Sequence, residues 1–141
     1  MKERSPVQSV AALVAVVFLL VGILGFVPGI TTHYGDLSFA GHDSDAKLLG
    51  IFQVSVLHNI VHLLFGIAGL VLARTADGGR TFLVGGGAVY LVLWLIGLIG
   101  AGDWIPVNTA DNWLHFALGV GMVALGLVFG RGPTRRPAAA N

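Results

Sequence analysis

Two histidines and an asparagine interrupt an otherwise apolar stretch of the chain, SVLHNIVHLLFG, at residues 55–66. His58 and His62 are four residues apart, so on a helix they share one face and can bind one metal ion together. In zinc proteases with this H-x-x-x-H spacing, a glutamate directly after the first histidine acts as the base. Here that position is Asn59, which cannot take a proton. Hydrolysis of that type is therefore not supported, and the sequence identifies no catalytic residue.

A metal site would need ligands beyond this pair. A third ligand could come from His115, or from the stretch at residues 28–48, which carries two further histidines and several aspartates. Imidazole suits zinc, copper and similar divalent metals, and carboxylates can complete such a site. The candidate metal ligands are His58, His62, His115, His33, His42, Asp43 and Asp45.

Haem b is a second cofactor that the histidines could bind, because bis-histidine ligation takes one histidine from each of two facing helices. If the two haem ligands occupy matching positions of similar sequence patterns, they are His62 and His115. If they lie at the same distance from the arginine that follows each helix, they are His58 and His115. Neither haem nor a divalent metal is favoured over a third interpretation, in which these side chains only form hydrogen bonds between helices.

The pattern N-x-x-H-x-x-x-G occurs twice, at residues 59–66 and 112–119. Helices through the two segments run in the same direction, so the pattern indicates a parallel repeat of two helical hairpins. One face of each helix carries polar side chains at one end and small residues at the other. The glycines among these small residues let helices approach closely. The polar ends predict a pocket formed by Ser55, His58, Asn59, His62, Asn112 and His115. The predicted packing positions are Gly66, Gly69, Gly119, Gly126 and Gly130.

The elements that position these residues are predicted to be transmembrane helices. Of the 141 residues, 55% are hydrophobic and 11% are charged, whereas a soluble domain has about 25% charged residues. The mean hydropathy is +0.85. We predict an all-α, four-helix transmembrane bundle in one domain, residues 1–141. Its helices are expected at about 8–27, 49–73, 81–102 and 110–130, followed by a disordered tail at about 132–141.

The sequence also predicts how these segments begin and are joined. The first apolar run is too long for a signal peptide and lacks a small-residue cleavage site, so it is expected to be a retained helix. Asp77-Gly78-Gly79 predicts a tight turn over Thr75–Arg80. Asn108 or Thr109 is expected to cap the last helix, with Asp111 in its first turn.

Positive charge is concentrated on one predicted side of the membrane. Seven of the eight Lys and Arg residues lie there: Lys2, Arg4, Arg74, Arg80, Arg131, Arg135 and Arg136. Only Lys47 lies on the other side. The positive-inside rule therefore predicts a multi-pass protein of the cell membrane with both termini in the cytoplasm. All five histidines then lie toward the extracytoplasmic side.

The chain resembles a family of small four-helix membrane proteins of actinobacteria, catalogued only as a domain of unknown function. The segments that carry the resemblance are LGIFQVSVLHNIVHLLFG, GGGAVYLVLW and PVNTADNWLHFALGVGMVALG, and the resemblance covers about residues 5–131. It implies an integral membrane protein. It implies no reaction, cofactor or site residue.

The expected function is that of a non-enzymatic membrane protein, structural or ligand-binding, with the polar pocket opening outward. The alternative is a membrane protein with a histidine-ligated metal or haem b. The lipid bilayer is the expected partner, while a second copy of the chain or another membrane protein is left open. No nucleic acid is expected, because the net charge is only +1 and no basic patch with aromatics occurs.

Overall fold

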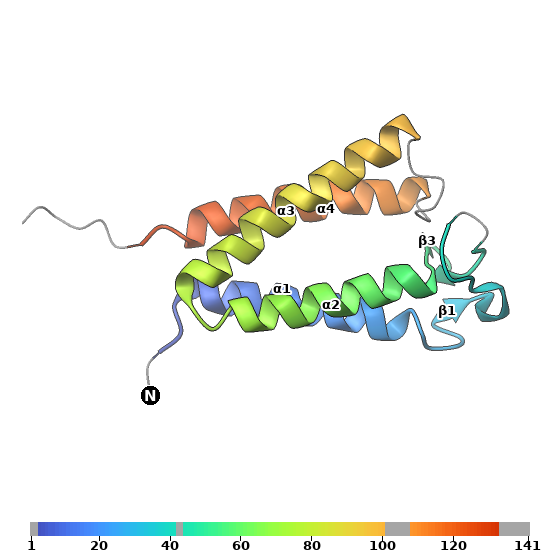
Figure 1. The fold of residues 1–141 in the computed structure, drawn as a ribbon, viewed down its shortest axis with the longest axis horizontal. Helices are drawn as coiled ribbons and strands as arrows, with labels where there is room; N and C mark the ends of the chain where they lie inside the picture. Colours follow the sequence, from blue (N-terminus) through green and yellow to red (C-terminus); the bar gives the residue numbers. More distant parts are fainter. Residues whose placement is uncertain (1–2, 42–43, 101–107, 133–141) are drawn as a thin grey trace, which may run out of the picture.

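The computed structural model describes residues 3–41, 44–100 and 108–132. Four helices make up most of this part of the chain: α1 (Pro6–Leu24), α2 (Val56–Leu72), α3 (Ala76–Ile99) and α4 (Thr109–Phe129). α1 and α3 run in one direction, and α2 and α4 run in the other (Figure 1). The predicted all-α bundle of four helices is confirmed. The predicted disordered tail lies almost entirely outside the described residues.

The helices bury small and polar residues together with a few large ones such as Phe18 and Leu83, and they expose many large apolar side chains. Along α1 the buried positions include Ala11 and Ala15, whereas Leu13 is 65% exposed. Along α2, Asn59 and His62 are buried while Leu64 is 60% exposed. This arrangement is the reverse of a soluble bundle and fits a protein whose outer surface faces hydrocarbon. α1, α3 and α4 are long and apolar enough to cross a membrane. α2 is apolar and has 17 residues, at the short end of the range of about 17–25 that can span one.

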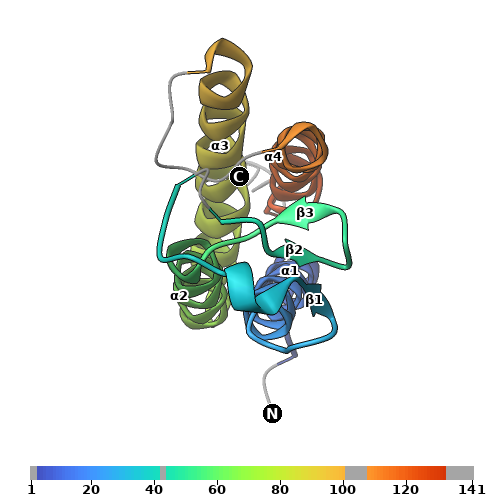
Figure 2. The ribbon, with the colours of Figure 1, turned by 90° about the vertical axis from the view of Figure 1, so that its right-hand side faces the viewer.

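The bundle consists of two hairpins, because α1 packs mainly against α2 and α3 mainly against α4. Figures 1 and 2 show the α1–α2 pair lying beneath the α3–α4 pair. Glycines mark the close approach within each hairpin. A Cβ atom on Gly66 would lie 2.6 Å from the Cγ atom of Leu19, and one on Gly119 would lie 2.7 Å from that of Leu91. Gly69 and Gly126 are also buried, and a Cβ atom on either would lie within 3 Å of a side chain of another helix.

Side-chain caps fix where three of the helices begin. Ser55 Oγ accepts a hydrogen bond from the backbone N–H of His58 at the start of α2, and Asn108 caps α4 by accepting one from Asp111. Thr75 Oγ1 accepts one from the backbone N–H of Gly78. The Asn108 cap is as predicted. The predicted turn at Thr75–Arg80 is wrong, because this cap places Asp77, Gly78 and Gly79 in the first turn of α3.

α2 begins at Val56 rather than at Leu49, because the chain before it forms a small sheet. Strands β1 (Thr31–Thr32), β2 (Lys47–Leu48) and β3 (Phe52–Gln53) pair antiparallel in that order. Three residues, 49–51, join β2 to β3, and the first two, Leu49 and Gly50, have φ angles of 55° and 72°. These angles suit a tight hairpin turn and are incompatible with a right-handed helix. A single helical turn, η1 (Tyr34–Asp36), lies between β1 and β2.

The sheet covers one end of the bundle with its own small apolar core. Ala46, Leu48 and Val54 are buried there, and Val21 and Leu24 of α1 pack against them. The Oγ of buried Ser44 donates a 2.6 Å hydrogen bond to the carbonyl of Val54. Figure 2, which views the molecule from this end, shows β2 and β3 in front of the helix ends. The connection between α1 and α2 is thus a folded cap rather than an open loop.

Candidate functional site

A cavity of about 250 Å³ lies between the two hairpins, at the end that the sheet covers. Its polar lining consists of four side chains, His58 and His62 from α2 and Asp111 and His115 from α4. The remaining lining is apolar and comes from α1, the sheet segment and α4: Val21, Leu24, Leu48, Leu49, Phe52, Val54, Leu114 and Leu118.

The four polar residues are two pairs of equivalent positions in the repeated hairpins. α2 begins one residue after Ser55 and α4 one residue after Asn108, so the two caps correspond. Counted from these caps, His58 corresponds to Asp111, and His62 corresponds to His115. The cavity therefore lies where the same helix face of each repeat meets the other, which is where binding sites of repeat-built membrane proteins are commonly found.

Aromatic rings of the preceding helices hold the two equivalent histidines. The ring of His62 lies 5.5 Å from that of Phe18 in α1, and the ring of His115 lies 5.3 Å from that of Tyr90 in α3, measured between centroids. Phe18 and Tyr90 contact each other at 5.3 Å. In each hairpin the histidine thus packs against an aromatic ring of the preceding helix. The contact between Phe18 and Tyr90 joins the two hairpins.

The imidazoles have hydrogen-bonding capacity that the protein does not use. The Nδ1 atoms of His58, His62 and His115 are buried, and none has a hydrogen-bond partner among the described residues. The Asp111 carboxylate differs, because it accepts a 3.1 Å hydrogen bond from the backbone N–H of Asn108. Buried polar atoms are nearly always paired with protein, water or ligand. Three residues that each carry such an atom line this one cavity, which makes it the candidate site.

The two asparagines of the repeat lie outside the cavity lining; Asn59 is buried and Asn112 is half-buried. Asn59 packs against Gly25 at the end of α1, and Asn112 packs against Gly97 of α3. Both Oδ1 atoms lack a hydrogen-bond partner in the part of the chain that the structure describes. A side chain larger than hydrogen at either glycine would overlap the asparagine. The two asparagines occupy equivalent positions of the repeat, so both hairpins use the same kind of contact.

The structure brings together only part of the predicted pocket. His58, His62 and His115 line the cavity, whereas Ser55 acts as a helix cap and Asn59 and Asn112 pack against glycines. Asp111 lines the cavity and was expected only as a first-turn residue of the last helix. Its place in the repeat, matching that of His58, is the sequence signal that could have identified it.

The described residues show no assembled set of the predicted metal ligands. No group of three or more His, Cys, Asp or Glu residues within the described ranges is placed to hold a metal ion. His33 and Asp45 are exposed on the sheet segment. His42 and Asp43 lie outside the described residues. The structure therefore does not test whether they could supply a third metal ligand.

Comparison with known proteins gives one match. The model of a family described as "Domain of unknown function (DUF4383)" matches residues 8–128, which contain all four helices except their outermost residues. No curated protein and no solved structure matches the chain.

Proposed function

The chain belongs to the DUF4383 family of unknown function, and we propose that it is a non-enzymatic membrane protein that binds a small molecule between its two hairpins. The observation that supports this most strongly is that one cavity is lined by three histidines, each with a buried Nδ1 atom that has no hydrogen-bond partner among the described residues. A purely structural role would leave these polar atoms unsatisfied, at a cost of about 1–3 kcal/mol each.

The lining indicates the chemistry of the ligand. Eight apolar side chains and four polar ones border the cavity, which favours a neutral, largely apolar molecule that carries one or two hydrogen-bonding groups. A hydroxyl or carbonyl group could pair with an imidazole, because a neutral imidazole has one nitrogen that donates and one that accepts. The apolar part of the molecule would lie against Leu114, Leu118 and the sheet.

The orientation in the cell membrane is part of the same proposal. Arg4, Arg74, Arg80 and Arg131 all lie at the end of the bundle opposite the sheet. The positive-inside rule assigns this end to the cytoplasm. The cavity and the sheet that covers it then face the outside, so a ligand would enter from the extracytoplasmic side.

A histidine-ligated metal or haem b is the second candidate. It is supported by the same three imidazoles, since His58 and His62 have ring centroids only 4.4 Å apart and His115 borders the same cavity. Against it stands the absence, among described residues, of a three-ligand group with metal-binding placement. A metal would therefore require the side chains to move toward one another.

One preparation distinguishes these candidates. The protein is purified from membranes in a mild detergent and examined by native mass spectrometry, elemental analysis and visible spectroscopy. We expect a small organic molecule retained by the parent and lost in the His62→Leu/His115→Leu variant. Stoichiometric zinc or copper, or a Soret band, would instead establish the second candidate. A parent with neither an organic adduct nor a cofactor would contradict both.

A further inference from the structure

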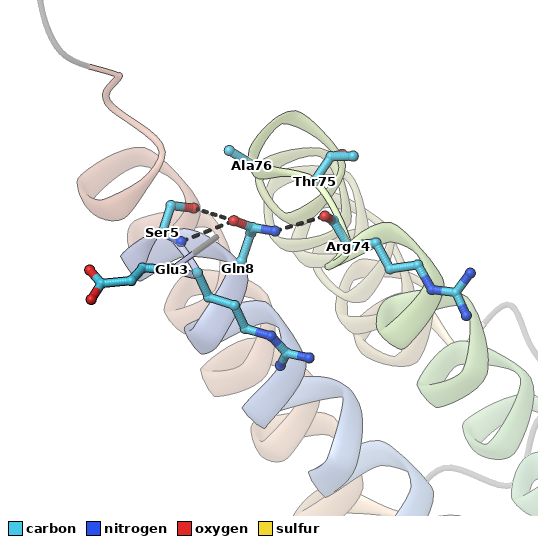
Figure 3. A pocket seen from close by; sticks show the side chains of 7 residues that line it. Glu3, Ser5, Gln8, Arg74, Thr75 and Ala76 are labelled. Carbon is cyan, nitrogen blue, oxygen red and sulfur yellow. Dashed lines mark hydrogen bonds between the residues drawn. The ribbon is translucent and has the colours of Figure 1, made fainter. Parts of the chain in front are cut away.

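A second cavity lies at the opposite end of the molecule, where the start of α1 meets the turn between α2 and α3. Its volume is about 600 Å³, and its lining includes two arginines, Arg4 and Arg74, and one acid, Glu3. Figure 3 shows it from close by, with Ser5 and Gln8 of the α1 start facing the chain at Arg74. It shares no lining residue with the histidine cavity.

Gln8 fixes the two walls of this cavity to each other. Its Nε2 atom donates hydrogen bonds to the carbonyls of Ala73 and Arg74, at 3.2 and 2.8 Å. Its Oε1 atom accepts bonds from the backbone N–H and the hydroxyl of Ser5, at 2.9 and 3.0 Å. The side chain therefore satisfies carbonyls at the end of α2 and holds the start of α1 beside them. The backbones of both arginines are positioned by this contact.

The arginines themselves are not neutralised. Both are exposed, and neither forms an ion pair within the described part of the chain. They also lie at the level where lipid headgroups are expected. Arg74 follows Val71 and Leu72 on α2, which are 52% and 38% exposed, and Arg4 precedes the apolar helix α1. Guanidinium groups bind phosphate oxygens in pairs of parallel hydrogen bonds, which makes arginine well suited to phosphate recognition.

We propose that Arg4 and Arg74 bind a phosphate group in this cavity, carried by an anionic phospholipid or supplied as a free phosphate ion. The α2–α3 turn contributes to the same site, because α3 begins at Ala76 on the cavity wall and its positive N-terminal end favours an anion. Glu3 opposes binding through its charge. Basic pockets between helices at a membrane surface are a known means of holding acidic headgroups.

The test uses the full chain in a neutral detergent and compares two double variants of equal charge. Arg4→Gln/Arg74→Gln removes both cavity arginines, and Arg80→Gln/Arg131→Gln removes two arginines at the same end that do not line the cavity. Native mass spectrometry measures binding of phosphatidylglycerol relative to phosphatidylcholine. We expect the parent and the control variant to prefer phosphatidylglycerol. The cavity variant should lose about tenfold or more of this preference relative to the control variant, the effect of one hydrogen bond from a charged group to the phosphate.

Two further arms identify the source of the phosphate and guard against misfolding. If inorganic phosphate raises the melting temperature of the parent but not of the cavity variant, and phosphatidylglycerol is not preferred, the ligand is the free ion. Glu3→Gln should strengthen phosphate binding, which tests the site without removing an arginine. The proposal is overturned if both double variants lose the preference equally. It is also overturned if the parent shows neither a lipid preference nor a response to phosphate.

Discussion

The residues that distinguish this bundle from a purely apolar one are the three histidines of α2 and α4. Each has a buried Nδ1 atom without a hydrogen-bond partner among the described residues, and all three histidines border one cavity. One interpretation of the sequence is that these side chains form hydrogen bonds between helices. Their Nδ1 atoms form no such bond among the described residues. The ring contacts with Phe18 and Tyr90 hold His62 and His115 in place instead.

The first prediction concerns the replacement of these two histidines by amides. His62→Gln and His115→Asn remove no hydrogen bond between Nδ1 and the protein, and an amide can still donate and accept. We expect each variant to fold with a loss of about 0.5–1.5 kcal/mol of stability, the contribution of the ring contact that each change removes. Thermal unfolding followed by circular dichroism measures this. A loss of bound metal or of a Soret band in either variant would instead support the cofactor alternative.

At the scale of the elements, the same contacts recur in both hairpins. Asn59 packs on Gly25 and Asn112 on Gly97, while Gly66 meets Leu19 and Gly119 meets Leu91. These matched contacts agree with the parallel repeat that the two N-x-x-H-x-x-x-G segments indicate. Two matched positions differ between the hairpins, since one has His58 and Phe18 where the other has Asp111 and Tyr90. Of these residues, His58 and Asp111 line the cavity.

The second prediction tests the helix contacts. Gly66→Leu and Gly119→Leu would force the side chain into the facing helix, because even a Cβ atom there lies within 3 Å of a leucine. We expect each to destabilise the bundle by about 1–3 kcal/mol, the usual cost of overpacking. Gly85→Leu and Gly121→Leu are the matched controls, since a Cβ atom at either position meets nothing within 4 Å. If all four variants melt alike, these glycines do not mark helix contacts.

Sequence patterns predicted the helices better than the segment between α1 and α2. Apolar length and the small-residue faces identified four helices and their buried sides, because in a membrane these features determine which residues face lipid. The start of α2 was placed too early because LLGIF is as apolar as a helix. In the structure, the positive φ angles of Leu49 and Gly50 and the cap at Ser55 separate it from α2. The cavity can be only half predicted, because half of its apolar lining comes from that same sheet segment: Leu48, Leu49, Phe52 and Val54.

At the scale of the whole molecule, polarity divides the bundle into two ends. One end has the sheet and the histidine cavity, and the other has four described arginines and the phosphate site proposed above. A ring of exposed aliphatic side chains lies between them, including Val17, Ile67, Val92 and Val120. This division is what a membrane imposes on a protein with two different aqueous faces.

The third prediction concerns orientation in the cell membrane. The chain has no cysteine, so single cysteines can report which side each end occupies. A membrane-impermeant maleimide should label Asp36→Cys on intact cells and Ala76→Cys only after permeabilisation, since both positions are exposed and the arginine-rich end should stay inside. The reverse labelling pattern would invert the bundle and place the histidine cavity in the cytoplasm.

The most direct test of the ligand proposal compares two probes that differ by one hydroxyl. In equilibrium dialysis with the detergent-solubilised protein, 1-naphthol can pair with an imidazole, whereas naphthalene offers only apolar contact. Retention by micelles alone is subtracted for each probe. We predict that the parent binds 1-naphthol about three- to tenfold more tightly than naphthalene, the effect of one net hydrogen bond. The His62→Leu/His115→Leu variant should lose this difference. Equal binding of both probes by the parent, or no retention beyond micelles, would contradict the proposal.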